Sequence, residues 1–81
     1  MNADELEFEE LYKLYQKRIR FYVYRRIGDP EATDQLVEAT FRRMKECFSV
    51  LNPSVPTVAH LYLIARQFVV EWHRSKYTRI V

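Results

Sequence analysis

The side chains most capable of covalent or metal chemistry are few and scattered along this sequence. His60 and His73 stand thirteen residues apart, and Glu71 precedes His73 by two, which on a helix points the two side chains to different faces. Cys47 falls on a hydrophobic stripe, as a small core residue does. The single glycine excludes a glycine-rich phosphate loop. We therefore expect no enzyme active site, no metal, no cofactor and no small-molecule substrate, which leaves binding functions.

Polar residues capable of binding lie on one face of the segment 57–77. Its apolar residues recur at helical spacing: Val58, Leu61, Tyr62, Ala65, Phe68, Val69 and Trp72. The opposite face carries His60, Gln67, Glu71 and Arg74, with Arg66 and His73 on one flank. Two interpretations stay open. This face is either the solvated side of a packed helix, or a surface that presents Gln67, Arg74 and their neighbours to a partner.

Two earlier segments must form helices that support this one. Residues 4–27 carry a broad stripe, which predicts packing against two neighbours: Phe8, Leu11, Tyr12, Tyr15, Ile19, Tyr22 and Val23, widened by Leu14 and Phe21. Residues 30–48 carry a narrower stripe: Thr33, Leu36, Val37, Thr40, Phe41, Met44, Cys47 and Phe48. The outer stripe of that segment is polar: Glu31, Gln35, Glu38, Arg42 and Glu46. The sequence therefore predicts an all-α fold, a compact bundle of three main helices over about 4–27, 30–48 and 57–77.

The boundaries between these helices have clear chemical causes. Gly28 is free to take the positive φ of a helix C-terminus. Asp29 is a good N-cap, and Pro30 is a good first helical residue. Residues 49–56 contain two prolines and form the one predicted internal loop.

The composition bounds the class of protein. The 81 residues make one small domain, and 48% of them are hydrophobic, which suffices for a core. A lone cysteine excludes an internal disulfide and favours a reducing, cytoplasmic location. No apolar run approaches the roughly 20 residues of a membrane span. Charge is segregated: −5 in residues 1–10, +6 in 11–27, −2 in 29–48 and +3 in the last segment. Such blocks either face different partners or are ordinary solvated surfaces.

The three predicted helices and the loop before the last one, taken in order, resemble region 2 of bacterial sigma factors of the extracytoplasmic-function group, over about residues 8–76. That family has a second helix with the motif D-L-V-Q-E-x-F-x-R and a last helix with W-L-x-x-I-A-R-N-x-x-x-D-x-x-R. The second motif is matched by Leu36, Val37, Phe41 and Arg43. The third is matched by Leu61, Tyr62, Ile64, Ala65, Arg66 and Arg74. The family's Asn and Asp are Gln67 and Glu71 here, each longer by one methylene, whereas its core-binding Asp, Gln and Glu are Gln35, Glu38 and Ala39.

The resemblance implies a transcription initiation domain that works without covalent chemistry. It implies that the second helix and part of the first bind the β′ clamp helices of core RNA polymerase, with Asp34, Gln35, Glu38 and Arg42 as contacts. It implies that the loop and last helix capture the non-template strand of the minus-ten promoter element, with Asn52, Ser54, Arg66, Gln67, Glu71, Arg74 and Lys76 facing DNA. Gln67 would read a base edge, and Arg66, Arg74 and Lys76 would neutralise phosphates. An anti-sigma factor is a further partner that the resemblance allows.

An alternative function stays open beside this one. Leu63 and Val70 lie off the main stripe of residues 57–77 and, if exposed, would suit a protein partner or a homodimer. The chain would then keep the sigma fold as a helical interaction module. The family's second domain, region 4, has no counterpart in these residues, so we expect either a fragment of a longer protein, which we favour, or a stand-alone region 2.

Overall fold

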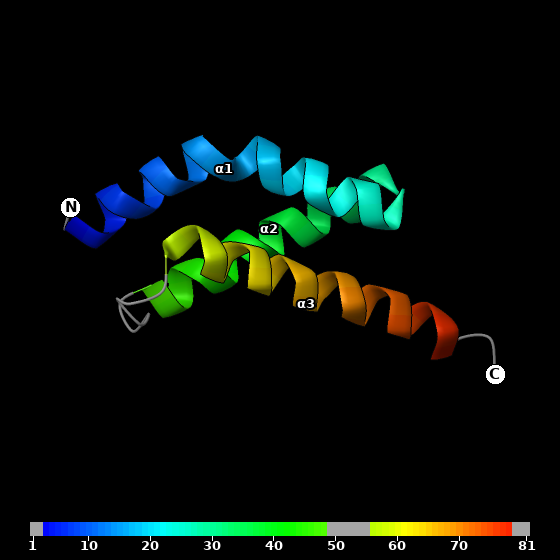
Figure 1. Cartoon of the computed structure of the whole chain (residues 1–81). Helices are drawn as coiled ribbons and strands as arrows, with labels where there is room; N and C mark the ends of the chain where they lie inside the picture. Colours follow the sequence, from blue (N-terminus) through cyan, green and yellow to red (C-terminus); the bar gives the residue numbers. More distant parts are fainter. Residues whose placement is uncertain (1–2, 49–55, 79–81) are drawn as a thin grey trace.

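The computed structural model describes residues 3–48 and 56–78, and these residues form three helices. Helix α1 spans Ala3–Ile27, α2 spans Pro30–Cys47 and α3 spans Thr57–Thr78. α1 and α3 run in the same general direction, and α2 runs back between them (Figure 1). Every pair of helices is in contact, so α1 packs against two neighbours, as its broad stripe predicts. The all-α bundle predicted from the sequence is confirmed, and its helix boundaries agree to within one residue.

The turn between α1 and α2 is built as the sequence predicts. Gly28 has a φ of +69°, and its N–H donates to the carbonyl oxygen of Tyr24 at 2.8 Å. The carboxylate of Asp29 caps α2 by accepting from the N–H of Ala32 at 3.1 Å. Pro30 then starts α2 at a position where no backbone donor is needed. The turn thus reverses the chain within two residues.

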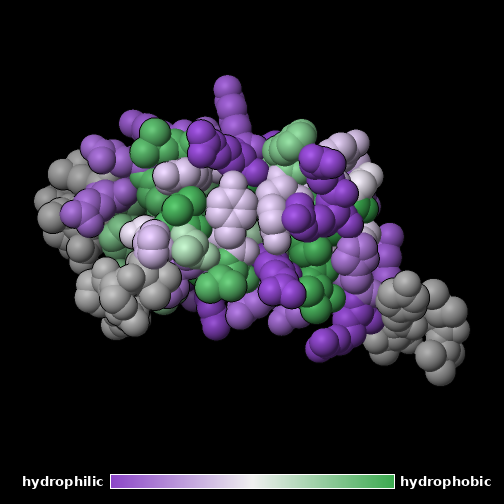
Figure 2. Space-filling model, viewed as in Figure 1, coloured by the Kyte–Doolittle hydropathy of each residue, from purple (hydrophilic) through white to green (hydrophobic). Residues whose placement is uncertain are grey.

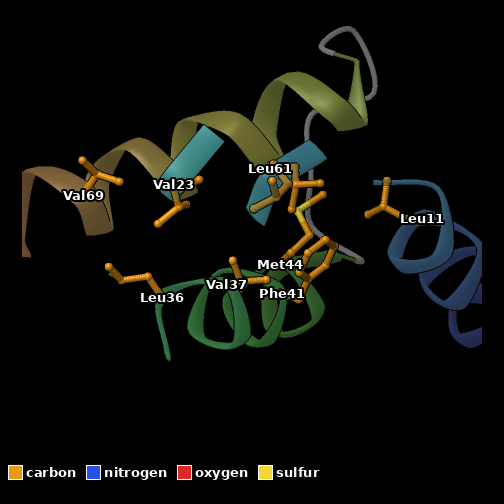
Figure 3. Packing of buried hydrophobic residues seen from close by; sticks show 10 residues of the cluster. Leu11, Val23, Leu36, Val37, Phe41, Met44, Leu61 and Val69 are labelled. Atoms are coloured by element: carbon orange, nitrogen blue, oxygen red, sulfur yellow. The ribbon is translucent and has the colours of Figure 1, made fainter. Parts of the chain in front are cut away.

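The core lies along the line where the three helices meet. Side chains from all three point toward one another there, with Val69 and Leu36 toward one end and Leu61, Met44 and Phe41 toward the other (Figure 3). The buried hydrophobic residues are Leu11, Ile19, Val23, Leu36, Val37, Phe41, Met44, Leu61, Ala65 and Val69. Burying each large aliphatic side chain contributes about 1.5–3 kcal/mol. The stripe predicted for α2 is confirmed, with Cys47 and Phe48 only half-buried at its end.

Two buried threonines complete the core face of α2. The hydroxyl of Thr33 donates to the carbonyl oxygen of Asp29, and that of Thr40 donates to the carbonyl oxygen of Leu36, both at 2.7 Å. Both side chains are almost fully buried. Their hydroxyls are satisfied within the helix, so threonine can occupy the core without an unpaired polar atom.

Four sequence predictions about side-chain placement are wrong. Tyr12, predicted in the core stripe of α1, is 42% exposed, and Leu14 and Phe21, predicted to widen that stripe, are 69% and 62% exposed. The two neighbouring helices cover only the sector of α1 that contains Ile19 and Val23, so the flanks of the stripe stay in solvent. His60, predicted on the solvated face of α3, is half-buried instead, and its Nε2 is enclosed with no hydrogen-bond partner among the described residues.

Candidate functional site

The polar face of α2 stays at the surface. Asp34, Gln35, Glu38 and Arg42 are all exposed, because the opposite stripe of the helix faces the core. Glu38 and Arg42 lie one turn apart, and the Arg42 guanidinium donates to the Glu38 carboxylate at 2.8 Å. Asp34 is paired with Arg20 of α1. Both pairs are more than half exposed, so each contributes only about 0–1 kcal/mol to stability.

A hollow of about 510 Å³ runs between α1 and α2 and brings three of these four residues together. Asp34, Glu38 and Arg42 line it, whereas Gln35 does not. The other lining residues are Phe8, Tyr12, Arg20, Val37, Phe41 and Lys45. Edge-to-face packing of Tyr12 on Phe41, with ring centroids 4.9 Å apart, makes part of the hollow apolar. The hollow therefore combines aromatic surface with charged groups of both signs, a combination suited to side chains of a protein partner.

Four of the residues predicted to face DNA share one surface on α3. Arg66, Gln67, Glu71 and Arg74 line a shallow hollow of about 560 Å³, and the remaining two lining residues are Leu63 and Val70. Within residues 3–48 and 56–78 no carboxylate pairs with Arg66. The side chain of Arg66 is exposed.

The other predicted DNA contacts lie apart from that surface or outside the described residues. The Nζ of Lys76 lies 4.1 Å from the ring centroid of Trp72, and Lys76 does not line the hollow. Trp72 is half-buried beside the core, as its place on the apolar stripe predicts. Asn52 and Ser54 lie outside the described residues.

Leu63 and Val70 are exposed by 52% and 42%, and they alternate with the polar residues of the same face. In the view of Figure 2, hydrophobic areas are separated by hydrophilic and pale side chains. On α3 the polar residues predicted to bind DNA and the apolar residues predicted to bind a protein therefore lie on one surface. The two functions proposed from the sequence would use that same surface.

The resemblance implies that part of α1 takes part in docking, but the sequence identified none of the α1 residues that line the hollow beside α2: Phe8, Tyr12 and Arg20. Arg20 binds Asp34, and the Nζ of Lys45 lies 5.8 Å from the ring centroid of Phe8. A signal for the first pair exists in the sequence: Arg20 lies eight residues before Gly28 and Asp34 six residues after it. Because the chain reverses at Gly28, residues at similar sequence distances before and after Gly28 lie beside each other on α1 and α2.

The described residues show neither a metal site nor a membrane-spanning helix. In the part of the chain that the structure describes, no three His, Cys, Asp or Glu side chains are grouped so as to hold a metal ion. None of its helices combines the length and hydrophobicity needed to cross a membrane. No family model matches the chain, and no curated protein or solved structure gives a match either.

Proposed function

We propose that this chain is a sigma-like transcription initiation domain that docks on core RNA polymerase through α2 and captures promoter DNA through α3. One observation carries the proposal. The apolar residues of both motifs pack in or against the core, as Leu36, Val37 and Leu61 do, whereas those polar residues with assigned roles that the structure describes are at the surface. This division agrees with the register of the resemblance, since partner-binding side chains must be accessible.

The hollow between α1 and α2 supports docking on a coiled coil. Helical partners commonly insert side chains into a groove between two helices. Tyr12, which is 42% exposed, offers apolar contact there, while Glu38 and Arg42 can exchange their mutual ion pair for pairs with the partner. Because that internal pair is exposed and weak, breaking it costs about 1 kcal/mol or less.

The surface of α3 supports capture of an unpaired strand. The Gln67 amide both donates and accepts, so it can read a base edge, and Arg66 can bind a phosphate. Arg74 and Lys76 add positive charge near the end of the helix. Binding and strand separation are the whole mechanism, with no bond made or broken. Such a domain acts in the cytoplasm, where an anti-sigma factor would compete for the same surfaces.

The test is a pull-down with bacterial core RNA polymerase. We expect the wild-type domain to bind at micromolar concentration, and Glu38→Lys and Arg42→Glu each to weaken binding about tenfold, the equivalent of about 1.4 kcal/mol. Lys13→Glu is the matched control, because Lys13 is exposed on α1 and does not line the hollow. Absence of wild-type binding, or equal binding by all four proteins, would refute docking through α2.

A second candidate function is a helical interaction module that binds a regulatory protein or a second copy. The exposure of Leu63 and Val70 favours it. Sedimentation velocity over a concentration series tests the homodimer, with Leu63→Ser/Val70→Ser as the variant. A concentration-dependent dimer that the double variant abolishes would favour this function, particularly if polymerase binding fails.

A further inference from the structure

The second half of α1 carries the densest positive charge in the described part of the chain. Between Leu11 and Ile27 it has six Lys or Arg residues and no acidic residue. Arg20 is paired with Asp34 of α2. The remaining cations have no part in the docking and strand capture proposed for α2 and α3.

Three of these arginines are held by aromatic rings one turn earlier in α1. The guanidinium carbon lies 5.8 Å from the Tyr15 ring centroid for Arg18, 5.5 Å from Phe21 for Arg25 and 3.6 Å from Tyr22 for Arg26. A ring attracts a guanidinium electrostatically without consuming its N–H donors, of which each arginine has five. Arg26 uses one donor on the carbonyl oxygen of Tyr22 at 3.1 Å. The rings thus orient these guanidinium groups, and N–H donors of each arginine remain to bind an anion.

The arginines surround a hollow of about 280 Å³ at the seam between α1 and α3. It is lined by Arg18, Phe21, Tyr22, Arg25, Arg26 and Tyr62. The rings of Tyr22 and Tyr62 meet edge to face across the seam, with centroids 5.2 Å apart. Phe21 is 62% exposed. Every described residue that lines the hollow is therefore either an arginine or an aromatic, and none of them is acidic.

Only a ligand that is both anionic and planar uses all of these groups. Phosphates accept from arginine, and an unstacked base can lie against an exposed ring. In a duplex the bases are stacked on each other and their faces are out of reach of Phe21. An acidic peptide would satisfy the arginines but leave the phenyl ring in water. We propose that this hollow binds single-stranded nucleic acid, with a base against Phe21 and flanking phosphates on Arg18 and Arg25.

The first test measures binding of fluorescein-labelled dT12 to the 81-residue chain by anisotropy at low salt. Phe21→Ala is expected to weaken binding at least fivefold, because stacking of one base on an aromatic ring is disrupted. The double variant Arg18→Ala/Arg25→Ala is expected to reduce the slope of log K against log salt by about 1.4, since each phosphate contact on a single strand contributes about 0.7.

The matched control is Lys13→Ala/Arg43→Ala, which removes the same charge from two exposed positions outside the hollow. It should leave the salt slope near the wild-type value. If the two double variants weaken binding equally and Phe21→Ala has no effect, dT12 is held only by net charge and the inference is overturned. The same holds if a polyglutamate peptide, or a duplex of equal length, binds as tightly as dT12.

Two further measurements separate this site from the one proposed on α3. Photo-crosslinking of dT12 that carries 5-iodouracil should label Phe21 or Tyr22, and a crosslink confined to α3 would overturn the inference. Arg66→Ala/Gln67→Ala should leave most dT12 binding intact. If that variant abolishes binding while Phe21→Ala does not, the site on α1 is refuted and the proposed role of α3 is supported. Failure of the polymerase pull-down does not affect this result.

Discussion

The Nε2 of His73 on α3 lies 2.9 Å from the backbone carbonyl oxygen of Arg26, in the last turn of α1. A carbonyl only accepts, so the imidazole must carry its proton on Nε2 and donate it. The carbonyls of a last helical turn lack partners within the helix, and His73 supplies one from another helix. This contact joins segments 47 residues apart and fixes α3 against the end of α1.

We expect His73→Phe to lower the free energy of unfolding by about 0.5–1 kcal/mol. Phenylalanine keeps a ring beside Trp72, whose centroid lies 5.1 Å from that of His73, but it cannot donate. For a domain of this size that loss lowers the melting temperature by about 2–8 °C, measured by circular dichroism. Ser75→Ala on an exposed position of α3 is the control. An unchanged melting temperature for His73→Phe would show that the hydrogen bond contributes nothing.

Leu61 and Leu63 form a matched pair for testing the core, since they are two residues apart on α3 and differ in burial. Leu61 is fully buried and Leu63 is 52% exposed. Leu61→Ala should cost about 2–5 kcal/mol, because it leaves a cavity among packed side chains, whereas Leu63→Ala should cost less than about 0.5 kcal/mol. Urea titrations measure both. Similar losses for the two variants would contradict the packing of α3.

The ion pair of Arg20 with Asp34 should contribute little to stability. Because salt screens exposed charges, much of that contribution should be lost at high salt concentration. A double-mutant cycle with Arg20→Ala and Asp34→Ala is expected to give a coupling of about 0.2–1 kcal/mol, because both side chains are more than half exposed. Thermal unfolding at low and high salt measures it. A coupling above about 2 kcal/mol, or one that salt leaves unchanged, would mean that the pair is far better shielded from water.

Gly28 should be replaceable only at a conformational cost. Its φ of +69° is unfavourable for residues with a Cβ, and a Cβ built there meets no atom within 4 Å. Gly28→Ala should therefore destabilise by about 1–2 kcal/mol from the backbone alone. Gly28→Asn should cost less, because asparagine tolerates this region better. Chemical denaturation distinguishes the two, and equal stability of both variants with wild type would contradict the left-handed turn.

The architecture could be predicted from the sequence because each helix boundary and each core stripe depends on residues that are close together in the sequence. In α2 the apolar residues occupy one side only, so helical periodicity alone identifies Leu36, Val37 and Met44 as buried. Asp29 and Pro30 mark the start of that helix for equally local reasons. Patterns of this kind involve only a few neighbouring residues. They can therefore be recognised without knowing how the partner helices pack.

The placement of α1 side chains could not be predicted as fully. That helix has hydrophobic residues around most of its circumference, so periodicity cannot tell which sector the neighbours cover. Phe21 and Leu14 are exposed because they lie on a side of α1 that α2 and α3 do not cover, although Ile19 and Val23 nearby are buried. His60 is half-buried for the converse reason, since tertiary packing encloses a polar residue on the side expected to face water.

The binding surfaces depend on the same tertiary information. The polar faces of α2 and α3 follow from periodicity, whereas the hollow beside Asp34 needs the register between α1 and α2. The hollow that contains Phe21 and Tyr62 joins residues of two helices that are not consecutive. A single-helix pattern cannot bring such residues together.

The two-residue connection between α1 and α2 also bears on how quickly this chain folds. Closing so short a loop costs little chain entropy, so the α1–α2 hairpin can form by a local search. α3 then needs only to dock on a surface already assembled by α1 and α2. Domains rich in such local contacts fold in microseconds to milliseconds. Residues at the Gly28–Asp29 turn should therefore govern the folding rate, while contacts such as that of His73 with Arg26 should govern the rate of unfolding.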